Sequence, residues 1–236
     1  MCFYNSNSKR TLDLAKRYGR KTDIVELLKE TLEEQYKITA FVHPECPIIT
    51  DNQNIETAKW GLIPNWIKDD AEAKKIKKMT LNARAETVFS LPSFRSSIMS
   101  KRCLVPSTGF FEFHHFGIEK IPYYIFLKNE DIFSFGGIFD DWKIPNLNET
   151  IKTFSILTVP ANEFCEKIHN GGSNPFRMPL IIARENEEKW LDNTLNINDI
   201  KHFFHPCKSS EMDAYTIARD FLKKNPKDRT IIKPAA

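Results

Sequence analysis

Apolar side chains recur at helical spacing near the N-terminus and at strand spacing through most of the remaining chain. Between residues 9 and 36 they follow one another at steps of three and four, as at Ile24, Leu27 and Leu28, which predicts a helix. From Pro47 onward, short runs rich in β-branched and aromatic residues predict strands. The predicted strands cover residues 46–50, 56–62, 102–105, 110–114, 123–127, 132–139, 153–159 and 178–183.

Turn residues separate most of these runs, and short helical segments lie between them. The helices are predicted at residues 71–77, 85–89, 93–99, 162–168 and 185–191. Strands and helices do not alternate strictly and no Gly-rich phosphate-binding motif is present, which disfavours a doubly wound nucleotide-binding fold. We therefore predict one α+β domain over residues 1–236, built around a mostly antiparallel, barrel-like sheet with short flanking helices. The Lys-rich segment after residue 190 is expected to be a surface extension.

Composition narrows the class of protein. Of 236 residues, 41% are apolar and 12% aromatic, which is ample for a buried core. The net charge of +3 permits a nucleic-acid partner without requiring one. No signal peptide or transmembrane run is visible, and the five scattered cysteines form no CxxC pair. We expect a cytoplasmic, monomeric protein with reduced thiols and without a metal or organic cofactor.

Cys2 is the first candidate for chemistry. Removal of Met1 would leave Cys2 with an amine and a thiol on adjacent carbons, both partly deprotonated near neutral pH. An aldehyde could form a Schiff base with the amine, and the thiol could then close a thiazolidine ring. Taken alone, Cys2 is better explained as a free cysteine near a frayed terminus.

Two further motifs follow along the chain. In residues 60–66, Trp60 fits a core position, whereas Trp66 could either pack in the core or stack on bases. Asn82 could cap a helix or orient a nucleophile. Arg84 could pair with an acid such as Glu86 or grip a phosphate.

Glu112 lies in a Phe-rich predicted strand. Strand alternation puts it on the same face as Phe110, with Phe111 and Phe113 on the other face. Apolar neighbours should raise the pKa of its carboxyl, which suits acid–base work near neutral pH. The alternative is an edge-strand glutamate that faces solvent.

The last candidates are His169 and several basic residues. His169 ends a predicted helix and could shuttle protons, or it could be structural. Arg177 precedes an apolar strand and could contact a phosphate or a buried carbonyl. Lys101 and Arg102, and less strongly the run 74–78, could hold a nucleic-acid backbone. A charge run is otherwise a solvated helix face.

Five motifs together resemble the SOS-response-associated peptidase (SRAP) family, whose members form DNA–protein crosslinks at abasic sites. They are Met-Cys (1–2), Trp-Gly-x-x-Pro-x-Trp (60–66), Asn-Ala-Arg-x-Glu-Thr (82–87), Arg-Cys-Leu-x-Pro-x-x-Gly-Phe-x-Glu (102–112), and Ile-His (168–169) with Arg-Met-Pro (177–179). The resemblance covers residues 2–190. It implies a partly open β-barrel with a cleft for single-stranded DNA.

The resemblance also implies roles for residues. Cys2 would be the nucleophile, and Asn82 would position it. Glu112 and His169 would move protons. Arg84 and Arg177 would bind phosphates, and the partner would be single-stranded DNA that contains an abasic site.

The chain departs from the family pattern in three places. Phe3-Tyr4 replace the usual Gly-Arg, Phe41 stands where an Asn is common, and seven residues separate His169 from Arg177. Two other functions stay open at this level. One is a peptidase or amidohydrolase with an N-terminal Cys nucleophile, and the other is a non-catalytic module that binds single-stranded DNA by base stacking.

Overall fold

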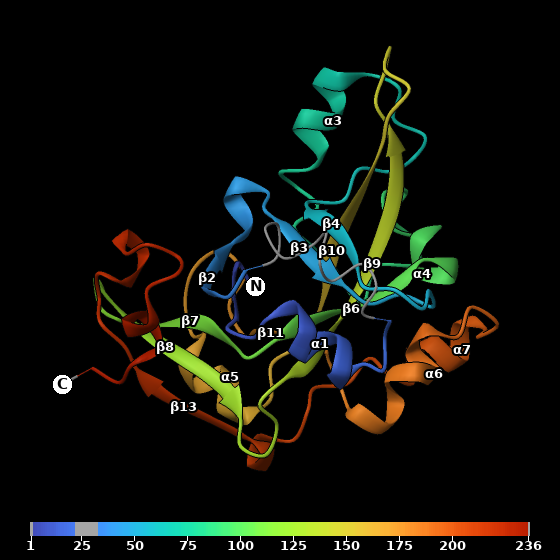
Figure 1. Ribbon diagram of the computed structural model, residues 1–236. Coiled ribbons are helices and arrows are strands. Elements are labelled where there is room, and N and C mark those ends of the chain that lie inside the picture. Colours follow the sequence, from blue (N-terminus) through green and yellow to red (C-terminus); the bar gives the residue numbers. More distant parts are fainter. Residues whose placement is uncertain (1, 22–32, 236) are drawn as a thin grey trace.

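The computed structural model describes residues 2–21 and 33–235, and within them the strands form two sheets (Figure 1). The five-stranded sheet has the order β13 (Met212–Thr216), β8 (Glu119–Leu127), β7 (Gly109–Phe116), β1 (Tyr4–Asn7) and β2 (Gln35–Thr39). The eight-stranded sheet has the order β12 (Ile181–Ile182), β9 (Phe133–Lys143), β10 (Thr150–Pro160), β4 (Glu56–Trp60) and β3 (Glu45–Ile48). In the same sheet β6 (Arg102–Ser107) pairs with β9, and both β5 (Asn82–Arg84) and β11 (Arg177–Pro179) pair with β10.

Short helices lie around the sheets. They are α1 (Thr11–Arg17), α3 (Asp70–Ile76), α4 (Ser97–Ser100), α5 (Glu163–Ile168), α6 (Glu187–Leu191) and α7 (Ile197–Lys201). Strand pairing is antiparallel except where β10 runs parallel to β4 and β5. The predicted α+β class, with mostly antiparallel sheets that do not close, is confirmed. Among the described residues, no helix is both long and apolar enough to span a membrane.

The predicted alternation along β7 explains how the sheets pack. Phe110 belongs to the main apolar core, whereas Phe111 and Phe113 pack in a second cluster with Phe221. The side chains of one strand thus enter two separate cores because successive residues point to opposite faces. Glu112 lies between them on β7 and is buried.

The N-terminal helix is much shorter than predicted. It ends at Arg17, and Gly19 follows with a φ of 59°, a left-handed conformation that commonly terminates helices. Residues 35 and 36 of the predicted helix belong to β2, and residues 22–32 lie outside the described part of the chain. Residues 85–89 form turns rather than the predicted helix.

The C-terminal segment is part of the domain, not the surface extension that its Lys-rich sequence indicated. Strand β13 pairs with β8 along its whole length, and Phe221 and Ile231 are fully buried. The buried Lys37 ammonium donates hydrogen bonds to the carbonyl oxygens of Phe221, Leu222 and Lys224. This lysine therefore ties β2 to the chain that follows β13.

Candidate active site between the two sheets

The backbone of Cys2 is held by residues from both sheets. Cys2 lies two residues before β1, which pairs with β7, and its side chain is completely buried. Asn82, on β5 of the other sheet, donates from Nδ2 to the Cys2 carbonyl oxygen at 3.0 Å. The alternative that Asn82 caps a helix is wrong, because it lies in a strand.

The Cys2 thiol is protonated at neutral pH. Burial is the main cause that raises its pKa, and the nearby Glu112 side chain raises it further when it is ionised. Its Sγ lies 3.8 Å from the carbonyl oxygen of Tyr4. A nucleophilic thiolate at this position therefore requires a neighbouring base.

Glu112 supplies an acid of unusual pKa beside Cys2. Its side chain is buried rather than solvent-facing, and burial raises the pKa of the carboxyl to about 8. The carboxyl oxygen Oε2 lies 3.8 Å from Nε2 of His169. Because its pKa exceeds 7, Glu112 is mostly protonated at neutral pH and can donate a proton.

His169 is the neutral partner in this pair. Burial lowers its pKa to about 4, so the contact with Glu112 is not an ion pair at neutral pH. Nδ1 lies 2.8 Å from the carbonyl oxygen of Arg177, which fits a proton on Nδ1 that is donated to this oxygen. The lone pair on Nε2 then faces Glu112, and His169 can accept a proton there.

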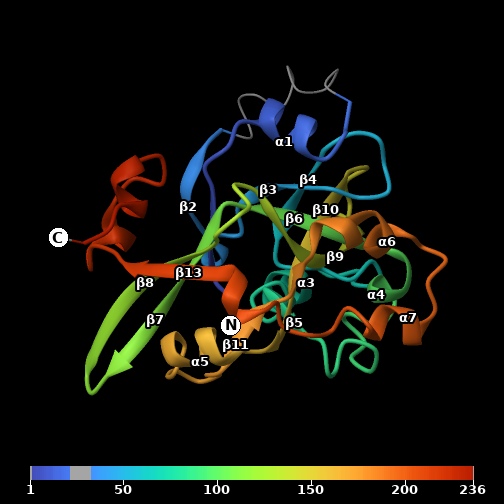
Figure 2. The same ribbon diagram turned by 90° about the horizontal axis from the view of Figure 1, so that it is seen from below.

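The end of α5 and a returning loop fix the position of His169. The Asn162 side chain caps α5 by accepting a hydrogen bond from the Cys165 backbone at 2.8 Å. After residues 170–175, the Phe176 N–H donates to the His169 carbonyl oxygen at 2.9 Å. Figure 2 shows α5 beside the hairpin of β7 and β8, so His169 directly follows a helix that packs on the strand of Glu112.

Two pockets flank the candidate site, and Phe3 lines both. The pocket of about 210 Å³ contains Glu112 and His169, and the pocket of about 350 Å³ contains Asn82 and Arg84. A larger pocket of about 460 Å³ lies elsewhere, beside β12 and residues 203–211, and none of the candidate residues lines it.

Arg84 and Trp66 are accessible to a ligand. Arg84 is exposed at the end of β5, where its guanidinium donates a hydrogen bond to the Asn174 side chain. The Trp66 side chain is 48% exposed, whereas Trp60 is buried and donates from Nε1 to the Leu81 carbonyl oxygen at 2.7 Å. In the run 74–78, Lys78 lines the same pocket as Arg84.

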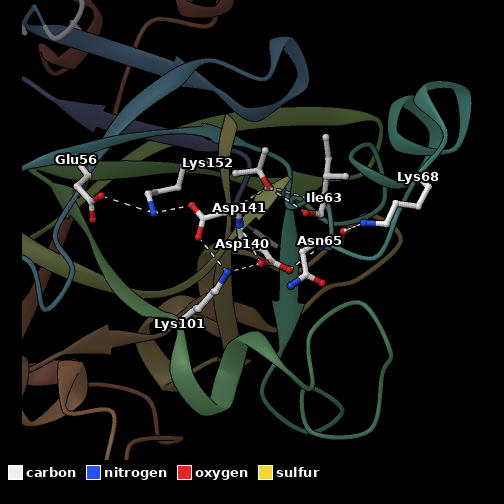
Figure 3. A network of polar contacts seen from close by, with 9 residues as sticks. Glu56, Ile63, Asn65, Lys68, Lys101, Asp140, Asp141 and Lys152 are labelled. Carbon is white, nitrogen blue, oxygen red and sulfur yellow. Dashed lines mark hydrogen bonds and ion pairs between the residues drawn. The ribbon is translucent and has the colours of Figure 1, made fainter. Parts of the chain in front are cut away.

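The expected DNA contacts of Lys101 and Arg102 are wrong. Figure 3 shows Lys101 directed at Asp140 and Asp141, at 2.7 and 3.0 Å. Arg102 is 2% exposed, and among the described residues its guanidinium donates only inward. Its acceptors are the carbonyl oxygens of Ile98, Met99, Trp190 and Asp192. Both side chains are therefore occupied by contacts within the fold.

Arg177 also makes internal contacts. Its guanidinium binds the Glu86 carboxylate and donates to the Thr158 carbonyl oxygen at 2.7 Å. Arg177 therefore contacts a buried carbonyl, which was the alternative to a phosphate. The backbone carbonyl oxygen of Arg177 in turn orients His169. In place of these cations, the 210 Å³ pocket contains His115 and Lys120, which the sequence analysis did not single out. Their proximity depends on strand register, so no local motif reveals it.

Comparisons with known proteins identify the family of this chain. The family model of the SOS response associated peptidases (SRAP) matches residues 1–223. The abasic site processing protein YoqW of Bacillus subtilis is 35% identical over 205 residues, which cover 84% of this chain and 86% of that protein. The abasic site processing protein HMCES of Gallus gallus is 34% identical over 57% of this chain and 44% of its own length.

A crystal structure of a Bacteroides thetaiotaomicron protein superposes with a TM-score of 0.96 at 48% identity, with both chains covered completely. A Bordetella bronchiseptica protein shares the fold with a TM-score of 0.77 at 19% identity and covers 92% of this chain. The family match spans both sheets and every candidate residue described above. The chain belongs to the SOS response-associated peptidase family.

Proposed function

We propose that this protein captures abasic sites in single-stranded DNA covalently through Cys2, after Met1 has been removed. The observation that carries the proposal is the hydrogen bond from Asn82 to the Cys2 carbonyl beside the neutral Glu112–His169 pair. The names of YoqW and HMCES, abasic site processing proteins, support DNA with abasic sites as the partner. The cytoplasmic location and the monomeric state stay predictions.

The chemistry conserves atoms at each step. Hydrolysis of the peptide bond between Met1 and Cys2 gives Met1 a carboxylate and Cys2 an amine. The amine attacks the C1′ aldehyde of the ring-opened sugar, and loss of the aldehyde oxygen as water leaves a Schiff base. The thiol then adds to the C=N bond and its proton passes to the nitrogen, which yields a thiazolidine.

Glu112 and His169 move the protons in these steps. Protonated Glu112 donates to the sugar ring oxygen as the aldehyde opens. It then accepts a proton from the attacking Cys2 amine and donates that proton to the departing water. Neutral His169 accepts a proton, which the buried, protonated thiol must release to add to the Schiff base. Running the steps backward reverses the crosslink.

A buried nucleophile favours single-stranded DNA. Cys2 is fully buried, so the abasic sugar must leave any base stack and enter a pocket to reach it. The exposed Trp66 offers a surface on which a neighbouring base can stack, and Arg84 offers a cation for a phosphate.

Denaturing gels with an abasic single-stranded oligonucleotide test the proposal. Wild-type protein should give a heat-stable band, and Cys2→Ala should give none while it still binds weakly. Cys2→Ser keeps the amine, so only borohydride reduction should reveal an adduct. A heat-stable crosslink in Cys2→Ala contradicts the mechanism. Peptide cleavage without a crosslink would support the peptidase, and binding alone would support the non-catalytic module.

Arg84→Ala tests the phosphate contact separately. Each neutralised phosphate contributes roughly 0.7–0.9 to the slope of log affinity against log salt, so this variant should bind more weakly and with a flatter slope. An unchanged slope would make Arg84 a structural partner of Asn174.

A further inference from the structure

Two basic residues and a glycine-containing loop line the 210 Å³ pocket together with Glu112 and His169. The basic residues are His115 on β7 and Lys120 on β8, and the loop consists of residues 171–174. His115 and Lys120 are direct partners in the antiparallel ladder, so their side chains lie on the same face of the sheet. The pairing concentrates basic groups beside the candidate site.

Asn170 fixes the loop against β7. Its Oδ1 accepts from the His115 N–H at 2.7 Å, and its Nδ2 donates to the His115 carbonyl oxygen at 3.0 Å. The side chain thereby makes the two hydrogen bonds that a neighbouring strand would make. Gly171 packs on the His115 ring so closely that a Cβ atom there would lie 2.4 Å from the ring carbon Cγ.

The charges around this pocket suit an anion. Glu112, the acidic side chain among its lining residues, is mostly protonated at neutral pH because burial raises its pKa to about 8. Glu119, next to Lys120, pairs with Arg219 at 2.9 Å. The Lys120 side chain is exposed and can reach a ligand as a compact point charge.

We propose that His115, Lys120 and loop residues 171–174 form a second phosphate-binding subsite for the DNA backbone. An abasic nucleotide carries one phosphate on its 5′ side and another on its 3′ side. Phe3 lines both pockets, with Arg84 in one and Lys120 in the other. A sugar held between them at Cys2 directs one phosphate to each cation. The inference rests on the proposed function and adds a contact to the second phosphate of the abasic nucleotide.

Neutral backbone analogues test this assignment. The probe is a single-stranded oligonucleotide with one tetrahydrofuran site, which cannot crosslink, and a methylphosphonate replaces either its 5′ or its 3′ phosphate. We expect each replacement to weaken binding to wild-type protein several-fold. Lys120→Gln should bind the unmodified probe several-fold more weakly and be insensitive to the replacement on one side only. Arg84→Gln should be insensitive on the opposite side.

Lys128→Gln is the matched control. Lys128 is also exposed, directly follows β8 and contacts the Ser210 carbonyl oxygen at the other end of the strand. It should keep wild-type affinity, whereas Lys120→Gln should lower the salt slope by about 0.7. Ser173→Asp, which adds a negative charge in the loop, should weaken binding as Lys120→Gln does.

Three results separate the subsite from the proposed function. If wild-type protein crosslinks abasic DNA but Lys120→Gln keeps its sensitivity to both methylphosphonates, the subsite is wrong and the proposed function stands. Equal losses in Lys120→Gln and Lys128→Gln would likewise overturn it in favour of diffuse surface charge. If wild-type protein forms no crosslink, the proposed function itself fails.

Discussion

Replacing Glu112 by glutamine removes the acid from the buried pair with His169 and leaves the side-chain shape almost unchanged. The carboxyl has a pKa of about 8, so about nine-tenths of it is protonated at pH 7. We expect Glu112→Gln to slow crosslinking and its reversal by about 10²–10⁴ at neutral pH, the usual effect of losing a general acid or base.

The pH profile makes this prediction specific. The Cys2 amine must be unprotonated to attack, so the wild-type rate should rise with pH toward the amine pKa near 8. Loss of the Glu112 proton should make the rate fall about tenfold per pH unit above pH 8. His169, with a pKa of about 4, stays neutral from pH 5 to 9 and adds no limb there.

Stopped crosslinking reactions from pH 5 to 9, resolved on denaturing gels, measure both limbs, and circular dichroism controls for folding. Glu112→Gln should keep the rising limb and lose the falling one. A falling limb that persists in Glu112→Gln would refute the assignment of the acid. His169→Ala should also be slow, and a wild-type rate in both variants would make the pair structural.

The same substitution has a consequence for stability. The folded-state pKa of Glu112 is raised from 4.5 to about 8, so its contribution is fully present below pH 4.5 and is lost as pH rises through 8. A tenfold change in a dissociation constant corresponds to about 1.4 kcal/mol, so the loss is on the order of a few kcal/mol. Urea denaturation should show this decline in wild-type protein and a smaller one in Glu112→Gln.

Three further substitutions separate structural cations from DNA contacts. Arg102→Met leaves four inward carbonyls without their donor, so urea midpoints should reveal a loss of about 2–4 kcal/mol, with the salt slope of DNA binding unchanged. Lys37→Met should cost about 1–3 kcal/mol and speed hydrogen exchange in residues 221–224. Trp66→Ala should weaken single-strand binding by about 1–3 kcal/mol in fluorescence titrations, without slowing crosslinking at saturating DNA.

Local sequence patterns predict the strands that are rich in apolar residues. They fail for strands whose formation depends on contacts with distant residues. Strand β7 is predicted because Phe residues lie on both sides of Glu112 in sequence. Strand β1 has the polar sequence YNSN, yet Asn5 is buried because its side chain bonds to the Pro106 carbonyl oxygen and accepts from Ser107. A strand of four residues is too short to show a sequence pattern, and the hydrogen-bond partners of Asn5 are about a hundred positions away in the sequence.

The candidate site shows the same division. The burial of Glu112 follows from its neighbours in sequence, and so does its raised pKa. Lys101 and Arg102 were assigned to a DNA-binding surface because charged side chains usually lie at the surface unless they have internal acceptors. Those acceptors are Asp140 and Asp141 on β9 and carbonyls near Trp190, which only the folded chain brings close.

Intact-mass spectrometry of the protein after incubation with an abasic single-stranded oligonucleotide tests the central claim most directly. Schiff-base formation releases one water and thiol addition releases nothing. The adduct should therefore have the mass of the chain without Met1, plus the oligonucleotide, minus one water, with the modification on Cys2. An adduct that retains Met1, that maps to a lysine, or that forms equally in Cys2→Ala would contradict the account.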